Sequence, residues 1–142
     1  MEPQTKSFGE LFKRITEVFE ARVNRDLQAH GITLAQMKVL ASLDQTKGQT
    51  ATLKELERFF NTSQATMAGL AVRLEKKGLV ASSAGTEDRR VKHIRLTEKG
   101  KALCRETGAQ MAAGERWLVG ALEPSESEQL RRLLMKVYES IK

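Results

Sequence analysis

The sequence predicts a mainly α-helical protein with a winged helix–turn–helix fold, built from six helices and a small β-hairpin. Three observations support this fold class. Apolar residues recur every three or four positions along most of the chain, two short strand-like segments stand together near its middle, and only 2 prolines occur in 142 residues. A chain of this length is typical of one domain with a buried core of its own.

The first helix is predicted over about residues 7–29, because its apolar residues form one continuous stripe. The stripe consists of Phe8, Leu11, Phe12, Ile15, Phe19, Val23 and Leu27. Gly31 ends this helix. Thr33 and Gln36 then form a capping box that opens a second helix, which runs to about residue 44.

A short third helix, a tight turn and a fourth helix follow. Thr52 and Glu55 form the capping box of the third helix, and the polar segment 61–63 separates it from the fourth, which starts near Ser63. Gly78 is suited to end the fourth helix, because glycine adopts the left-handed conformation that closes many helices. The apolar face of the fourth helix is formed by Met67, Leu70, Ala71 and Leu74.

A β-hairpin and two further helices complete the chain. Residues 79–81 and 91–96 are predicted to be strands, joined by a polar loop over 82–90. Thr97 caps a fifth helix that runs to about residue 120, and the segment 125–128 forms a third capping box that starts the last helix. One face of the last helix carries Leu130, Leu133, Leu134, Val137, Tyr138 and Ile141.

Three glycines interrupt the predicted fifth helix at six-residue intervals, at Gly108, Gly114 and Gly120. Each costs about 1 kcal/mol of helix stability relative to alanine, so the repeat needs an explanation. Either these positions let a second helix approach closely, or the helix bends where it joins two parts of the molecule.

The net charge of +6 is concentrated in the middle of the chain. Residues 51–101 hold 11 basic and 6 acidic side chains, whereas segments 1–50 and 102–142 have net charges of +1 and zero. A basic segment between neutral ones indicates either a unit that binds a polyanion or a solvated basic face.

The fourth helix has the composition expected of a helix that enters the major groove of DNA. Residues 61–74 contain no acidic side chain, so nothing in this segment repels phosphates. Gln64 can bond both edge atoms of an adenine, and Ala68 and Gly69 are small enough to let the backbone approach the bases. An ordinary amphipathic helix with a polar face is the alternative interpretation. The DNA-contacting residues expected here are Ser63, Gln64, Thr66, Ala68, Gly69 and Arg73.

The loop of the hairpin contains the sequence Asp88-Arg89-Arg90. An arginine suits the narrow minor groove, where the negative potential of DNA is strongest. Asp88 can pair with Arg90 through both carboxylate oxygens and so fix the direction of the guanidinium. We therefore expect Asp88, Arg89, Arg90 and Lys92 to belong to a DNA surface, with Asp88 as a brace rather than a contact. A solvated turn with opposite charges is the alternative.

No residue pattern for catalysis, a metal or a cofactor is found in the sequence. The single cysteine, Cys104, excludes an intrachain disulfide and is interpreted as a buried or half-buried packing residue. His30 is interpreted as a helix cap and His93 as a strand residue, and neither has partners at metal-ligand spacing. Phosphate-binding glycine loops and nucleophile motifs do not occur. We expect no enzymatic activity, no metal and no cofactor.

The sequence shows no signal for membrane insertion or for export. No apolar run approaches the ~18 residues of a membrane span. Residues 1–4 carry an acidic group and lead into no apolar segment of the kind found in secretory signals. A cytoplasmic protein without membrane contact is therefore expected.

Four segments together resemble the MarR family of bacterial transcriptional regulators. They are Thr52-Leu-Lys-Glu-Leu, the run from Leu74 through Glu-Lys-Lys-Gly-Leu to Val80, Glu87-Asp-Arg-Arg90, and Ile94-Arg-Leu-Thr-Glu-Lys-Gly100. Their order and spacing match the family over about residues 52–100, and the helix pattern matches over the whole chain. One departure is Ala81-Ser82, where family members often carry a basic residue.

The resemblance implies a single MarR-type domain over residues 1–142. Residues 1–30 and 105–142 would form the dimerisation lobe of a homodimer, and residues 33–100 the winged helix–turn–helix DNA-binding lobe. The protein would be a sequence-specific regulator, most often a repressor, bound to a near-palindromic operator of double-stranded DNA. A small aromatic or anionic ligand between the lobes would release it. The alternative function is a winged-helix module for protein–protein contact without a specific DNA site.

The resemblance also assigns roles to single residues. The family's recognition-helix contacts correspond to Ser63, Gln64, Thr66 and Arg73. Its minor-groove arginine corresponds to Arg90, and the brace of that arginine to Asp88. The oxidant-sensing cysteine of some members has no counterpart in the first helix, so that mechanism is not expected.

Overall fold

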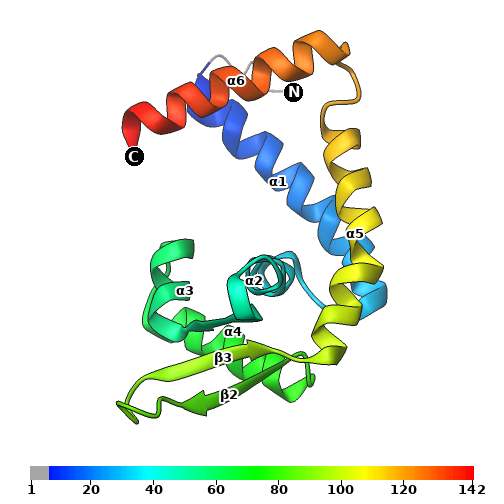
Figure 1. Ribbon diagram of the computed structural model, residues 1–142. Helices are drawn as coiled ribbons and strands as arrows, with labels where there is room; N and C mark the ends of the chain where they lie inside the picture. Colours follow the sequence, from blue (N-terminus) through cyan, green and yellow to red (C-terminus); the bar gives the residue numbers. More distant parts are fainter. Residues whose placement is uncertain (1–6) are drawn as a thin grey trace.

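The computed structural model describes residues 7–142 and confirms the predicted fold class (Figure 1). The N-terminal segment on which the export prediction rests lies outside the described residues. The helices are α1 (Phe8–Leu27), α2 (Leu34–Asp44), α3 (Leu53–Phe60), α4 (Gln64–Lys76), α5 (Glu98–Leu118) and α6 (Pro124–Ile141), and the strands are β1 (Thr50–Thr52), β2 (Val80–Ala84) and β3 (Lys92–Leu96). Two short 3₁₀ turns, Gln28–His30 and Lys47–Gln49, follow α1 and α2.

The sheet has three strands where the sequence predicted two. Strand β1 pairs antiparallel with β3, which places Thr50 opposite Arg95, and β3 pairs with β2 in turn. The prediction of a two-stranded hairpin was therefore incomplete. A segment of three residues is too short to show the alternation that identifies a strand, and its pairing partner lies more than 40 positions away.

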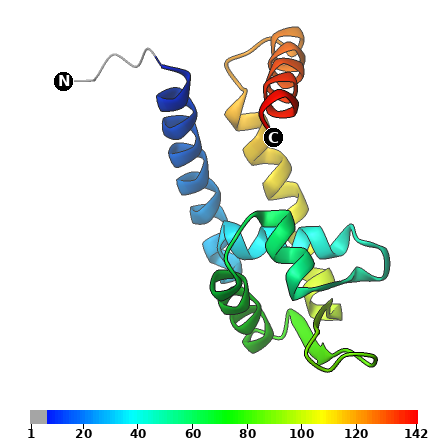
Figure 2. The same cartoon turned by 90° about the vertical axis from the view of Figure 1, so that its left-hand side faces the viewer.

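The elements form a compact part and a projecting part. Helices α2, α3 and α4 surround the sheet, while α1 and α5 pack together near it and diverge farther away, and α6 stands at the far end of α5 (Figures 1 and 2). The buried core lies where the end of α1 and the start of α5 meet the compact part. It comprises Val23, Leu27, Ile32, Leu34, Met37, Val39, Leu40, Leu43, Ala51, Leu56, Met67, Ala71, Leu74, Leu79, Val80, Ile94, Leu96 and Leu103.

Two glycines close helices as the sequence predicted. Gly31 and Gly78 adopt left-handed backbone angles, with φ of 72° and 74°, directly after the first 3₁₀ turn and after α4. A third glycine, Gly100, is needed for another reason. A Cβ at this position would overlap the carbonyl oxygen of Leu79, so only glycine lets α5 start this close to the chain that enters β2.

The last helix begins two residues earlier than predicted. Pro124 occupies its first turn and Glu123 is the N-cap, with a capping box in which the Glu126 carboxylate accepts from the Glu123 amide at 2.9 Å. The expected box at Ser125 and Glu128 does not form. Proline is favoured at the first helical position, where its missing N–H costs nothing, and this preference sets the start.

The glycine repeat has one structural explanation, at Gly114. A Cβ there would contact Val23 at 3.4 Å and Phe19 at 3.7 Å, so α1 and α5 approach closely at this point. At Gly108 a Cβ would meet open space, and Gly120 lies beyond the end of α5. The six-residue spacing therefore does not mark one continuous contact line.

Large apolar side chains are exposed mainly on the projecting part. Of the 17 such residues in the described chain, 15 lie in α1, the end of α5, the following turn or α6. Helix α6 buries none of its residues against the rest of the described chain. The 15 residues are Phe8, Leu11, Phe12, Ile15, Val18, Trp117, Leu118, Leu122, Leu130, Leu133, Leu134, Met135, Val137, Tyr138 and Ile141, and we call them the terminal apolar face. A face of this extent is typical of a protein–protein interface.

Candidate nucleic-acid interface

Helix α4 starts after a three-residue turn, as predicted for a helix–turn–helix. Asn61 ends α3 with a left-handed conformation, at φ 50°. Ser63 caps α4: its hydroxyl oxygen accepts from the Thr66 amide at 3.1 Å, and the hydroxyl donates to the Thr66 Oγ1 at 2.9 Å. Two of the predicted contact residues are therefore held together at the first turn of α4 before any ligand arrives.

The inner and outer faces of α4 are clearly divided. Met67, Ala71 and Leu74 are buried in the core. The predicted contact residues Gln64, Thr66 and Arg73 are exposed, as is Ser63, while Ala68 and Gly69 are half-buried. The Cβ of an alanine at position 69 would meet no atom within 4 Å, so packing within the chain does not require this glycine.

The loop between β2 and β3, the wing, holds Arg90 in a fixed direction. The Asp88 Oδ1 accepts from the Arg90 backbone amide at 3.0 Å and from its Nε at 3.1 Å, and Oδ2 accepts from Nη2 at 3.1 Å. The expected bidentate brace is thus formed. The Arg90 side chain is nevertheless 91% exposed. Because an exposed ion pair adds little to stability, the pair serves orientation rather than folding.

The pair with Arg90 also changes the pKa of the Asp88 carboxylate. Hydrogen bonds from the Arg90 side chain and backbone hold the pKa of Asp88 below its usual value of 3.8. A lowered pKa means that the pair is complete above pH 3.8 and is lost only as the pH falls through the lowered value. The brace therefore stays intact throughout the neutral range.

A groove of about 570 Å³ between α3, α4 and the wing brings together residues far apart in the sequence. Gln64 lines it together with Asp88, Arg90 and Lys92. Two further cations in this groove, Lys54 and Arg58, were not predicted; both are exposed on α3, and the carboxylates of Glu55 and Glu57 line the groove beside them. The i,i+4 spacing of the two cations on one helix face was the signal that could have identified them.

The other predicted residues lie outside this groove. Ser63, Thr66, Ala68, Gly69 and Arg73 belong to α4 itself, and Arg89 is exposed next to Arg90 in the wing.

Lys77, at the C-terminal end of α4, has a role that the sequence did not indicate. Its ammonium group donates to the Gly31 carbonyl and, at 2.9 Å, to Oε1 of the buried Gln36. A lysine held in this way is not available to a phosphate. The neighbouring Lys76 is exposed and is therefore the candidate for a phosphate contact at this end of α4.

A metal-ligand cluster and a membrane-spanning helix are both absent from the described residues 7–142. No group of three or more His, Cys, Asp or Glu side chains there could hold a metal ion, and no helix is long and apolar enough to cross a membrane. Cys104 is half-buried, as predicted, and burial raises the pKa of its thiol to about 11. It therefore stays protonated at neutral pH, unlike a reactive cysteine.

Residues 32–92 match the family model described as "MarR family", a range that covers the helix–turn–helix and most of the wing. This part of the chain is similar to the MarR family. The predicted resemblance is confirmed, and its members in the comparisons are transcriptional regulators rather than enzymes.

Three MarR-type relatives illustrate the similarity. The transcriptional repressor MprA of Escherichia coli K12 is 29% identical over 114 residues, which are 80% of this chain but only 65% of MprA, so the chain spans about two thirds of that relative. The structure of S. aureus MepR in complex with DNA matches with a TM-score of 0.86 and 26% identity, covering 96% of this chain and 100% of MepR. Bordetella bronchiseptica BpsR, whose DNA binding is regulated by 6-hydroxynicotinic acid, matches with a TM-score of 0.83 and 27% identity over 97% of both chains.

Proposed function

We propose that this protein is a homodimeric transcriptional repressor of the MarR family that binds a specific near-palindromic DNA operator. The observation that carries the proposal is the arrangement of α4 and the wing. An acid-free helix face lies beside a pre-oriented arginine and a groove lined by four cations, Lys54, Arg58, Arg90 and Lys92. This is the arrangement expected when one element enters the major groove and another reaches the minor groove. The expected compartment is the cytoplasm, where bacterial DNA is found.

The terminal apolar face supports a homodimer. Residues of α1 and α6 are apolar and exposed in the single chain, at the end of the molecule opposite the sheet (Figure 1). Pairing of two such faces would leave two copies of α4 free to bind half-sites about one helical turn apart. In this proposal residues 1–30 and 105–142 serve dimerisation and residues 33–100 serve DNA binding.

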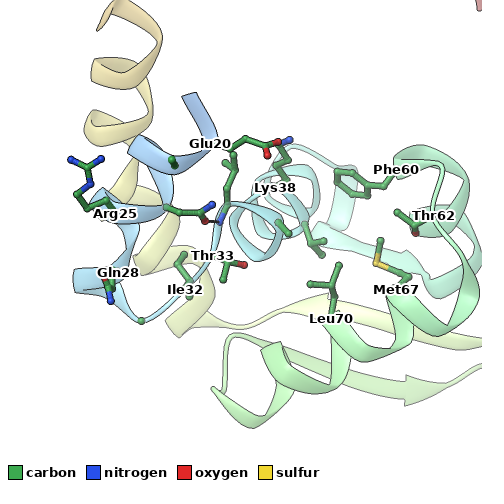
Figure 3. A pocket seen from close by; sticks show the side chains of 16 residues that line it. Glu20, Arg25, Gln28, Ile32, Thr33, Lys38, Phe60, Thr62, Met67 and Leu70 are labelled. Atoms are coloured by element: carbon green, nitrogen blue, oxygen red, sulfur yellow. Dashed lines mark hydrogen bonds between the residues drawn. The ribbon is translucent and has the colours of Figure 1, made fainter. Parts of the chain in front are cut away.

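A pocket next to α4 supports control by a small ligand. It encloses about 840 Å³ between α1, α2, the end of α3 and α4 (Figure 3). Lys38 provides a cation and Phe60 an aromatic surface; Glu20 and Arg25 also line the pocket, and the Arg25 side chain extends away from Phe60 (Figure 3). These features suit a small aromatic acid, the class to which the BpsR effector 6-hydroxynicotinic acid belongs. Because Met67 and Leu70 line the pocket from the inner face of α4, an occupant would bear directly on the DNA-binding helix.

A gel-shift titration with the promoter region of its own gene tests the proposal. We expect a discrete complex that survives an excess of unrelated duplex DNA and weakens as salt rises, because phosphate contacts release counterions. A winged-helix module for protein contact would show equal, weak affinity for both duplexes. That outcome would refute the proposed function.

Gln64→Ala is expected to relax base preference without changing the salt dependence. An exposed glutamine at the start of α4 can bond N6 and N7 of one adenine, which is worth about 1–3 kcal/mol of discrimination, and no phosphate contact is lost. Measuring binding to all single-base variants of the operator at several salt concentrations gives both the base preference and the salt dependence. Lys76→Ala is the matched control, with weaker binding on every sequence and a salt slope smaller by about one unit. Unchanged base preference in Gln64→Ala would remove this residue from base readout.

Gly69→Ala is expected to stabilise the free protein and weaken DNA binding. The new Cβ meets open space in the chain, so the variant gains helix propensity, up to about 1 kcal/mol. The same Cβ would stand between the helix backbone and the bases. Gly108→Ala is the control, because its Cβ also meets open space but lies on α5. Thermal unfolding and operator affinity are measured on both variants. Both should be more stable than wild type, but only Gly69→Ala should bind the operator more weakly. Equal affinity of the two variants would contradict a close approach of the backbone to the bases at position 69.

A further inference from the structure

Val72 is an exposed apolar residue that the chain itself does not use. It is 42% exposed on α4, and only two of the 17 exposed large apolar residues, Val72 and Phe59, lie outside the terminal apolar face. Phe59 packs edge-on against Phe60, with ring centroids 4.9 Å apart. Val72 takes no part in the core cluster and lies across the helix from buried Met67 and Leu74.

The surroundings of Val72 leave it prominent on the outer face of α4. Residues three and four positions earlier in a helix are the neighbours on the same face, and here they are Gly69 and Ala68. Neither projects far from the backbone. In the other direction the neighbours three and four positions later are Glu75, whose carboxylate accepts from the Ser82 hydroxyl at 2.8 Å, and the exposed Lys76. Val72 is therefore an apolar projection with small residues on one side, and on the other a cation and a carboxylate that is bonded to Ser82.

The proposed dimer does not cover this residue. The terminal apolar face belongs to α1, α6 and the end of α5, while α4 lies beside the sheet at the opposite end of the molecule (Figures 1 and 2). The outer face of α4 is also free of other elements of the described chain. An apolar group that stays exposed in the dimer is left for the molecule that α4 binds.

The major groove offers one apolar group to such a side chain, the C5-methyl group of thymine. We infer that Val72 is a specificity-determining residue that selects thymine, at one position of each half-site, by contact with this methyl group. The inference rests on the proposed function, because it requires α4 to lie in the major groove. Small Ala68 and Gly69 allow the helix to lie deep enough for the contact, and Lys76 is placed to bond the adjacent phosphates.

Replacement of thymine by uracil isolates the methyl group, since all hydrogen-bonding atoms are retained. We would prepare operator duplexes with one thymine of each half-site changed to uracil, position by position, and measure affinities by fluorescence anisotropy. For wild type we expect one position at which uracil weakens binding about fourfold per half-site, the factor for burial of one methyl-sized group. Val72→Ala should bind the thymine operator more weakly and should not distinguish thymine from uracil at that position.

Two controls separate this inference from its premises. Lys76→Ala should weaken binding to thymine and uracil duplexes by the same factor, so that the full preference for thymine remains. Thermal unfolding of Val72→Ala should match wild type, because the residue is exposed and alanine favours helix. If wild type and Val72→Ala lose affinity equally at every uracil position while both bind the operator, the inference is overturned and the proposed function stands. If wild type binds no duplex at all, the proposed function fails and the inference with it.

Discussion

Arg90→Ala is expected to weaken operator binding by about 10- to 100-fold, the loss that one charged hydrogen bond of roughly 1.5–3 kcal/mol predicts. The reason is structural. The Arg90 side chain is 91% exposed, yet its guanidinium donates two hydrogen bonds to Asp88 and its backbone amide donates a third, so it meets DNA without first having to be ordered. Fluorescence anisotropy with a labelled operator measures the change.

Two further variants give this prediction its controls. Arg132→Ala removes an equally positive, exposed side chain from α6 and should leave affinity nearly unchanged. Asp88→Ala should weaken binding even though it removes a negative charge next to the phosphates, because the guanidinium loses its fixed direction. Tighter binding by Asp88→Ala would show that charge alone governs this site and that the brace has no function.

Leu134→Asp is expected to abolish dimerisation and, with it, high-affinity operator binding. Leu134 belongs to the terminal apolar face and is 40% exposed in the single chain, so a carboxylate there need not disturb the fold of the chain. Buried in a dimer, the same carboxylate would be desolvated without a partner. Light scattering should give about twice 15.9 kDa for wild type and about 16 kDa for the variant at micromolar concentration.

The matched control for this experiment lies on the same helix. Arg132→Asp places a carboxylate on the side of α6 away from Leu134 and should remain dimeric. Operator affinity should follow the oligomeric state, because a monomer contacts one half-site only. A wild-type protein that is monomeric under these conditions, or a dimeric Leu134→Asp, would contradict the proposed interface.

Local signals in the sequence were sufficient for the helices and for the wing brace. Capping by Thr33, Ser63 and Thr97 involves residues three positions apart, and the Asp88–Arg90 pair spans two. Such contacts can be predicted from the order of residues alone. The start of α6 was missed by two residues because a glutamate N-cap before proline competed with the serine motif that follows it.

Contacts between distant segments could not be predicted in this way. Strand β1 is defined by its pairing with β3, and the groove of Gln64, Lys54 and Arg90 exists only once α3, α4 and the wing are packed together. Lys77 has the most misleading sequence context: it stands in a basic run at a helix end, yet its partner Gly31 lies 46 residues earlier. Whether each of the predicted DNA contacts is made stays a prediction that the proposed variants test.

The contacts of Lys77 limit how independently the parts of the molecule can move. Its ammonium group links the end of α4 to the connection between α1 and α2, and its carbonyl accepts from the Lys99 ammonium at 2.8 Å at the start of α5. These hydrogen bonds therefore tie the helix proposed to meet DNA to the helices that lead to the proposed dimer interface. In such a dimer, we expect these contacts to resist a change in the separation of the two α4 helices. An operator with one base pair inserted between its half-sites turns one of them by about a tenth of a helical turn, which such a dimer would resist unless the duplex bends.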